Sequence, residues 1–253
     1  MHHEAHIPHT EPPVDPPTFI APRRGEVIFG IIYLVLHMLF IGPAIYLGFL
    51  ALGTSLSAIA LNLIYFLTAT LVSVLIMRRY LIASFARFRT YGFLQNLKVF
   101  GLGLAIRYGS AIPLSTLILI LLPDFSATPN TEAVHELANQ HFFFTAFLAV
   151  VLAPIVEELL FRGAIYGGLR NKSKVAAYLV STLLFALLHV LSFLFFIPLG
   201  TLFLMMLLYI PSGFALAWSY EKSGNIWTPI FLHALMNVIA LALGGILPEG
   251  GYY

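Results

Sequence analysis

Long apolar segments constrain this chain more than any other feature of its sequence. Seven segments approach or exceed the roughly 20 residues with which an α-helix crosses the hydrocarbon core of a bilayer. Hydrophobic residues make up 60% of the chain and charged residues only 9%, whereas a soluble domain has about 25% charged residues. The sequence therefore predicts an all-α fold, a polytopic transmembrane bundle of about seven helices at residues 27–52, 56–77, 99–122, 142–170, 175–190, 193–219 and 226–247.

The sixth apolar segment contains residues that interrupt helices: Pro198, Gly200, Pro211 and Gly213. A proline inside a helix removes a backbone hydrogen bond and crowds the preceding turn. We therefore expect this segment either to kink or to split into two shorter helices. A split would raise the count to eight helices and would decide on which side of the membrane the C-terminus lies.

Residues 1–25 differ from the rest of the chain. They contain no apolar run long enough for a signal peptide, and they are rich in proline and histidine, including His2, His3, His6 and His9. Such a composition predicts a disordered tail, which we expect to be cytoplasmic. A flexible tail offers no rigid metal site, so we expect no functional metal binding by these histidines. Residues 26–253 are then the transmembrane domain.

The positive charges predict how the helices are oriented. They precede the first segment and then occupy alternate loops, as Arg23 and Arg24, then Arg78, Arg79, Arg87, Arg89 and Lys98, then Arg170, Lys172 and Lys174, and finally Lys222. The loop predicted at 123–141 has no Lys or Arg and is acidic. Because cytoplasmic loops are enriched in Lys and Arg, we expect a multi-pass protein of the plasma membrane with a cytoplasmic N-terminus. The net charge of +2 indicates no nucleic-acid partner.

The fourth apolar segment carries two adjacent carboxylates, Glu157 and Glu158, followed by Arg162. Ionisable residues inside a membrane are costly, and they are usually paired in the bundle interior and functional. Glu158 and Arg162 are four residues apart and share a helical face, whereas Glu157 is rotated by roughly 100°. Glu157 is therefore our candidate general base, with Glu158 and Arg162 in support. Pro154 predicts a kink just before them. The alternative is a buried ion cluster that only fixes helix packing.

Two later segments carry histidines with helical spacing. Phe185 and His189 form an FxxxH pattern, and His233 and Asn237 form an HxxxN pattern. Each pattern alone is explained by hydrogen bonds between helices. At 1.5 Å per residue, however, Glu157 and these three polar residues all lie about 16–22 Å from the basic residues at one end of their helices. We therefore expect Glu157, His189, His233 and Asn237 to meet near the middle of the bilayer.

These three motifs, in this order inside apolar segments, resemble the CPBP family of intramembrane proteases, which includes the type II CaaX prenyl endopeptidases and Abi-like proteins. The resemblance covers about residues 142–247, which would be the protease core. It implies hydrolysis of a peptide bond in a membrane-associated or lipidated substrate. The residue types suit a mechanism in which Glu157, helped by His189, activates a water molecule while His233 and Asn237 stabilise the oxyanion. Glu158, Arg162 and Phe185 would support the site.

Zinc is the cofactor that this resemblance raises, because the family is often described as metalloproteases. Glu157, His189 and His233 are a legitimate set of zinc ligands. The usual HExxH motif is absent, the chain has no cysteine, and asparagine is a poor zinc ligand. We therefore favour hydrolysis without a metal cofactor and keep zinc as the alternative.

Two other classes of function use buried ionisable residues. A proton-coupled transporter needs them along a route to both surfaces, whereas here they concentrate at one level. A non-catalytic membrane immunity or scaffold protein would keep its biological activity when Glu157 is changed to alanine. The sequence leaves open the substrate's identity, including whether prenylated proteins are cleaved, and the oligomeric state.

Overall fold

A computed structural model describes residues 19–53, 57–122 and 128–244 of the chain. All regular secondary structure in these ranges is helical. Six helices in them are long and apolar enough to cross a membrane, and a further apolar helix, Trp227–Leu243, is shorter. The predicted all-α polytopic bundle is confirmed, and the chain is a multi-pass membrane protein.

Several membrane spans are built from more than one helical piece. In chain order the elements are α1 (Arg24–Leu36), the π turn η1 (His37–Ile41), α2 (Gly42–Ala51), α3 (Ala58–Tyr91), α4 (Phe93–Leu121), α5 (Pro129–Phe147), the π turn η2 (Leu148–Leu152), α6 (Ala153–Glu157), the π-helical segment η3 (Glu158–Tyr166), α7 (Gly167–Arg170), α8 (Lys174–Leu191), α9 (Leu199–Leu207), α10 (Ile210–Ser223) and α11 (Trp227–Gly244). The predicted break in the sixth span lies between α9 and α10, where Pro211 occupies the first turn of α10.

Two loops predicted from hydropathy are helical instead. The predicted loop 123–141 becomes helix from Pro129 onward, because the Thr128 hydroxyl accepts a hydrogen bond from the Thr131 N–H and proline suits the first helical turn; residues 123–127 lie outside the described ranges. Likewise α3 continues through the basic residues to Tyr91. Hydropathy marks where an apolar run ends, but a helix can continue as a polar helix beyond it.

The boundary of the predicted tail is also wrong. Residues 1–18 lie outside the described ranges, but the residues that follow them pack onto the bundle. The ring of Phe19 contacts that of Tyr220 edge-on at 4.9 Å, and the N–H of Ile20 donates to the carbonyl of Gly224. α1 then begins at Arg24. These contacts link the first described residues to the end of α10, so the membrane domain begins before residue 26.

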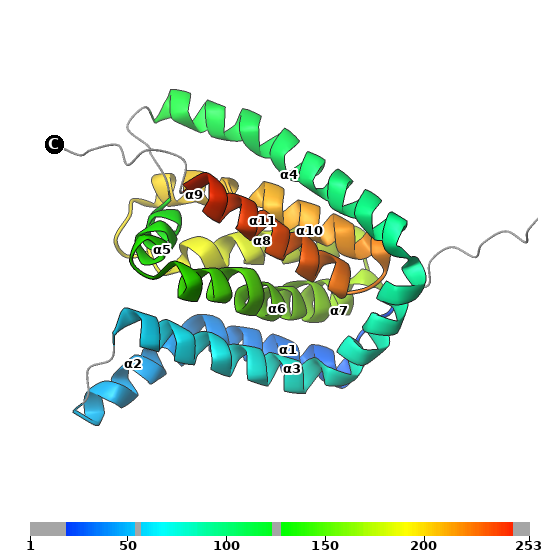
Figure 1. Ribbon diagram of the computed structural model, residues 1–253, viewed down its shortest axis with the longest axis horizontal. Coiled ribbons are helices and arrows are strands. Elements are labelled where there is room, and N and C mark those ends of the chain that lie inside the picture. The colour runs from blue at the N-terminus through cyan, green and yellow to red at the C-terminus, as the bar shows by residue number, and fades with distance from the viewer. Residues whose placement is uncertain (1–18, 54–56, 123–127, 245–253) are drawn as a thin grey trace, which may run out of the picture.

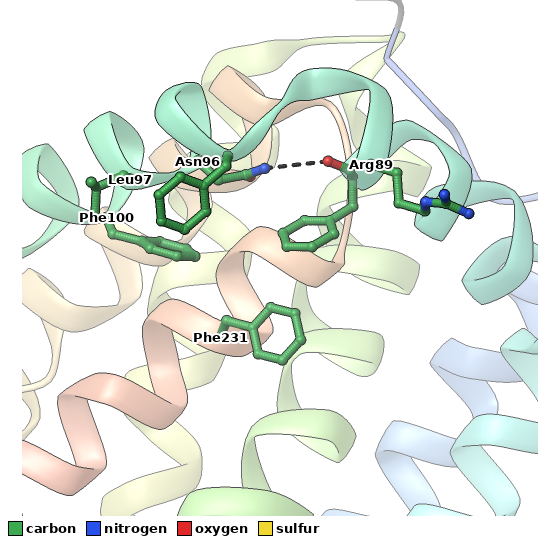
Figure 2. A pocket seen from close by; sticks show the side chains of 7 residues that line it. Arg89, Asn96, Leu97, Phe100 and Phe231 are labelled. Carbon is green, nitrogen blue, oxygen red and sulfur yellow. Dashed lines mark hydrogen bonds between the residues drawn. The ribbon is translucent and has the colours of Figure 1, made fainter.

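The helices form three groups in space (Figure 1). α1 and α3 lie side by side along one flank, α4 lies along the opposite flank, and α6, α7, α8, α10 and α11 lie between them. α3 and α4 meet at Gly92, whose φ of 88° favours glycine. The side chain of Asn96 donates to the backbone carbonyls of Phe88 and Gly92 and so holds this turn (Figure 2).

α1 approaches η3 closely at a pair of small residues. A Cβ atom built on Gly30 would lie 2.7 Å from the Cβ of Ala164, closer than side chains tolerate. Small residues let membrane helices approach at the level of their backbones. This contact holds α1 against the helix that carries the two carboxylates.

Candidate active site

The helix that carries Glu157 and Glu158 is widened on both sides of the first carboxylate. The short α6 lies between η2 and η3, and Pro154 is in its first turn. Proline cannot donate to the carbonyl four residues earlier and crowds it, and a π turn relieves both problems. The predicted kink therefore takes the form of wide turns, which often occur at functional sites.

Glu158 and Arg162 form a fully buried ion pair. The distance from Arg162 Nη1 to Glu158 Oε1 is 2.8 Å, and both side chains are 0% exposed. Arg162 Nη2 also donates to the carbonyl of Gly213 on α10 at 2.9 Å. Its guanidinium lies 4.5 Å from the centre of the Phe185 ring. The predicted pair is thus present, and it joins η3 to α8 and α10.

His233 brings α11 to both carboxylates. Its Nδ1 lies 2.9 Å from Glu158 Oε1, and its Nε2 lies 4.0 Å from Glu157 Oε2. Because a carboxylate paired with Arg162 only accepts hydrogen bonds, Nδ1 carries the proton of the first contact. Glu157 Oε2 is buried and has no hydrogen-bond partner among the described residues. Glu158 therefore orients the imidazole, and Glu157 faces its other nitrogen.

Phe185 connects the two histidines. The centre of its ring is 4.7 Å from that of His189 and 5.8 Å from that of His233. Nδ1 of His189 donates to the backbone carbonyl of Phe185 at 2.8 Å, which leaves Nε2 to face a reacting group. His189 is thus linked to His233 through the ring of Phe185, and His233 in turn approaches Glu157. That Glu157 and the two imidazoles act together in one site stays a prediction.

Asn237 occupies a different position from the one expected of an oxyanion donor. Its Nδ2 donates to the carbonyl of Ala149 in η2 at 2.7 Å. This bond ties α11 to the π turn that precedes the carboxylates. The carboxamide has a second N–H, so a contribution to an oxyanion site stays a prediction.

Two aromatic residues near the site were not predicted from the sequence. Tyr209 stacks on His189 with ring centres 4.3 Å apart, and its hydroxyl lies 2.6 Å from Thr128 Oγ1. The hydroxyl of Tyr65 lies 2.9 Å from Nε2 of the buried His37, and the two rings stack with centres 4.7 Å apart. His37 was not predicted either, although an ionisable residue inside an apolar segment is a signal that could have identified it. No local pattern identified either tyrosine.

The alternative zinc site was tested against the arrangement of its donors. Glu157, His189 and His233 carry the donor types of a zinc site, but across the described parts of the chain no three His, Asp or Glu side chains converge as a ligand set. Nδ1 of each histidine donates to a protein oxygen, which leaves each Nε2 available and is compatible with either alternative. Without a third convergent ligand among the described residues the side chains form no zinc site as arranged, and hydrolysis without a metal stays our prediction.

Comparisons with known proteins point to one family. Residues 139–239 match the family described as Type II CAAX prenyl endopeptidase Rce1-like. YdiL of Bacillus subtilis (strain 168), which is named as a membrane peptidase, is 31% identical over 115 residues, covering 45% of this chain and 42% of YdiL. MroQ of Staphylococcus aureus (strain USA300), named as a membrane-embedded CAAX protease, is 30% identical over 129 residues, covering 48% of this chain and 47% of MroQ.

A third relative, YxdF of Lactococcus lactis, is 28% identical over 113 residues, covering 45% of this chain and 57% of YxdF. The chain thus aligns with roughly half of the length of each curated relative. No solved structure matches it significantly. The matched segment contains all seven residues of the three motifs, from Glu157 to Asn237. This segment of the chain is therefore similar to the family of type II CAAX prenyl endopeptidases.

Proposed function

We propose that this chain is an intramembrane endopeptidase that hydrolyses a peptide bond with a water molecule activated by Glu157. One observation carries the proposal. Glu157 Oε2 is buried without a hydrogen-bond partner among the described residues, and it faces His233 Nε2 across 4.0 Å. A buried carboxylate oxygen without a hydrogen-bond partner is costly unless a ligand or a reaction uses it.

The gap between these two atoms suits a water molecule. If a water oxygen lay about 2.8 Å from both atoms, the angle Oε2–water–Nε2 would be roughly 90°, which hydrogen-bond geometry tolerates. Glu157 would accept one of its protons. His189 would assist from the other side of the Phe185 ring, which lies near both histidines.

Hydrolysis then follows from the residues present. Glu157 accepts a proton from the water, with His189 assisting, and the water oxygen attacks the carbonyl carbon of the scissile bond. The carbonyl electron pair moves to the oxygen, where His233 Nε2–H and the second N–H of Asn237 stabilise it. When the tetrahedral intermediate collapses, the C–N bond breaks and Glu157 returns its proton to the leaving nitrogen.

Both ring nitrogens of His233 are placed to donate. Nδ1 lies 2.9 Å from Glu158 Oε1, and Nε2 lies 4.0 Å from Glu157 Oε2. Donation from Nε2 to an oxyanion, together with donation from Nδ1 to Glu158, requires a ring that carries both protons.

The substrate class follows from the membrane setting. The site lies in the interior of a helix bundle, so we expect a membrane-associated or lipidated peptide or protein. MroQ, one of the relatives, is named as a CAAX protease, which makes lipidated C-termini the first substrates to try. We keep the predicted plasma-membrane location with a cytoplasmic N-terminus.

The proposal is tested by comparing membrane peptides from cells that carry the native chain, Glu157→Ala or Glu136→Gln. Glu136 is an exposed carboxylate on α5 and serves as the matched control. We expect cleavage products that are present with the native chain and with Glu136→Gln but absent with Glu157→Ala. Identical peptide sets in all three strains would contradict an endopeptidase and favour a scaffold or a transporter.

A further inference from the structure

A basic hollow lies between the first turn of α1 and the middle of α3. It encloses about 350 Å³ and is lined by Arg23, Gly25, Glu26, Phe29, Ile76, Arg78 and Arg79. None of these residues belongs to the candidate active site. The hollow therefore calls for an explanation that goes beyond the proposed function.

The three arginines in this basic hollow form no ion pair with an acidic residue of the described ranges. Arg23, Arg78 and Arg79 are exposed, and within the described ranges all ion pairs involve other residues. Unpaired guanidinium groups that share one hollow repel each other, so an anion bound among them would be stabilised by all three.

Glu26 is the one carboxylate that lines the basic hollow, and the backbone already uses both of its oxygens. They accept hydrogen bonds from the N–H of Arg23 at 2.8 Å and from the N–H of Tyr80 at 2.9 Å. These bonds hold the carboxylate as the N-terminal cap of α1 against α3. With three guanidinium groups against this single carboxylate, the lining carries a net charge of +2.

The basic hollow lies at the membrane boundary. The part of α3 from Ala58 to Met77 is about 30 Å long at 1.5 Å per residue, which matches the thickness of the hydrocarbon core. Arg78 and Arg79 follow directly, at the level of the lipid headgroups. Phe29, which is 63% exposed, lies more than one turn deeper than Arg23, on the hydrocarbon side.

We propose that the basic hollow binds an anionic phospholipid. Arg23, Arg78 and Arg79 would hold the phosphate through charge-assisted hydrogen bonds, for which the guanidinium fork is well suited. Phe29 and Ile76 would contact the first part of an acyl chain. Basic pockets between membrane helices are known to bind anionic headgroups. A free phosphate would contact the arginines but would leave the apolar side chains of Phe29 and Ile76 without a ligand. A zwitterionic lipid would bring a positive charge of its own next to the three arginines.

A second hollow of similar size shows the contrast. It lies at the turn between α3 and α4 and is lined by Phe88, Arg89, Phe93, Asn96, Leu97, Phe100 and Phe231. Its walls are mostly aromatic, and its single arginine, Arg89, points away from the phenylalanine rings (Figure 2). It lacks a cluster of cations. Arg89 therefore serves as a control position for the basic hollow.

Native mass spectrometry of the full chain in an uncharged detergent tests this proposal, with added phosphatidylglycerol or phosphatidylcholine as the probes. We expect phosphatidylglycerol to bind the native chain more tightly than phosphatidylcholine. Each arginine removed should weaken this binding by about fivefold, so Arg78→Gln with Arg79→Gln should weaken it by about 25-fold. The control pair, Arg24→Gln with Arg89→Gln, removes the same charge outside the basic hollow and should change the affinity less than twofold.

Three outcomes would overturn the proposal. If both pairs of substitutions weaken phosphatidylglycerol binding equally, the attraction is diffuse, and if the native chain binds the two lipids equally, the hollow does not select an anionic lipid. If about 1 mM inorganic phosphate displaces phosphatidylglycerol, the hollow is a site for a free anion. Each variant is checked for a single symmetric peak in size-exclusion chromatography. If the Arg78/Arg79 pair fails this check, Arg23→Gln alone should still weaken binding by about fivefold. The assay does not depend on peptidase activity, so it can fail or succeed independently of the proposed function.

Discussion

Nδ1 of His233 lies 2.9 Å from Oε1 of Glu158, although 75 residues separate the two in the chain. The same oxygen also accepts a hydrogen bond from Arg162, so the carboxylate of Glu158 holds α11 against η3, and Arg162 extends the network to α10 through the carbonyl of Gly213. Glu158 is thus a positioning residue for the imidazole of His233 as well as the ion-pair partner of Arg162. This relationship separates the expected effects of changing the two adjacent glutamates.

Glu158→Gln should destabilise the fold. It would leave the Arg162 guanidinium buried without a counter-charge, and breaking a buried ion pair by removing one partner costs about 3–5 kcal/mol. Unfolding in detergent, followed by circular dichroism, measures the loss. Glu136→Gln is the control, since Glu136 is exposed on α5, and it should cost about 0.5 kcal/mol or less. Equal losses in the two variants would argue against the positioning role of Glu158.

Glu157→Gln should have a large effect on cleavage and a small effect on stability, in contrast to Glu158→Gln. Its Oε2 has no hydrogen bond to lose among the described residues, whereas removal of a general base slows hydrolysis by about 10²–10⁴-fold. Cleavage of a substrate found by the peptide comparison and the unfolding midpoint are measured on the same preparation. A variant that unfolds as readily as Glu158→Gln would show that Glu157 is a packing residue.

His233→Asn should distinguish the structural role of His233, which is its bond to Glu158, from its role in the reaction. The asparagine amide can replace Nδ1–H as the donor to Glu158, but nothing replaces Nε2. We expect the variant to keep most of its stability and to lose about 10²-fold or more in cleavage rate. His233→Leu removes both nitrogens and should lose stability as well. If both variants cleave at the native rate, the imidazole takes no part in the reaction.

Gly30→Val should push α1 away from η3. A Cβ at this position would lie 2.7 Å from the Cβ of Ala164, and overpacking of this kind costs about 1–3 kcal/mol. Gly101→Ala is the control, because a Cβ there meets no atom within 4 Å, and it should leave stability unchanged or slightly higher. Thermal unfolding in detergent compares the two. An unchanged unfolding midpoint for Gly30→Val would mean that α1 can move away from η3 without a loss of stability.

Chelation should leave cleavage intact. The described residues hold no three convergent metal-ligand side chains, and the mechanism above draws the proton transfers from Glu157 and the histidines. The full chain is treated with a chelator, dialysed, and assayed with and without added zinc. Activity that is lost on chelation and returns only with zinc would make Glu157, His189 and His233 a ligand set that rearranges on binding.

Much of this protein follows from local sequence pattern. The apolar segments predicted a helical membrane bundle, because the length needed to cross a bilayer is set by the rise per residue. The Glu158–Arg162 pair followed from the i, i+4 spacing, which holds wherever the helix is placed. The ends of the helices were less predictable. α3 continues as a polar helix to Tyr91, and α5 begins at Pro129 because Thr128 caps it, so hydropathy predicts neither end.

Tertiary structure alone decided which side chains face each other. The bond of His233 to Glu158, the bond of Asn237 to Ala149 and the stacking of Tyr209 on His189 depend on how far each helix is rotated about its own axis. The π turns around α6 also set that rotation for the two carboxylates. Spacing within one helix determines depth and face, but it cannot determine the rotation of one helix relative to another, because close packing between helices sets that angle.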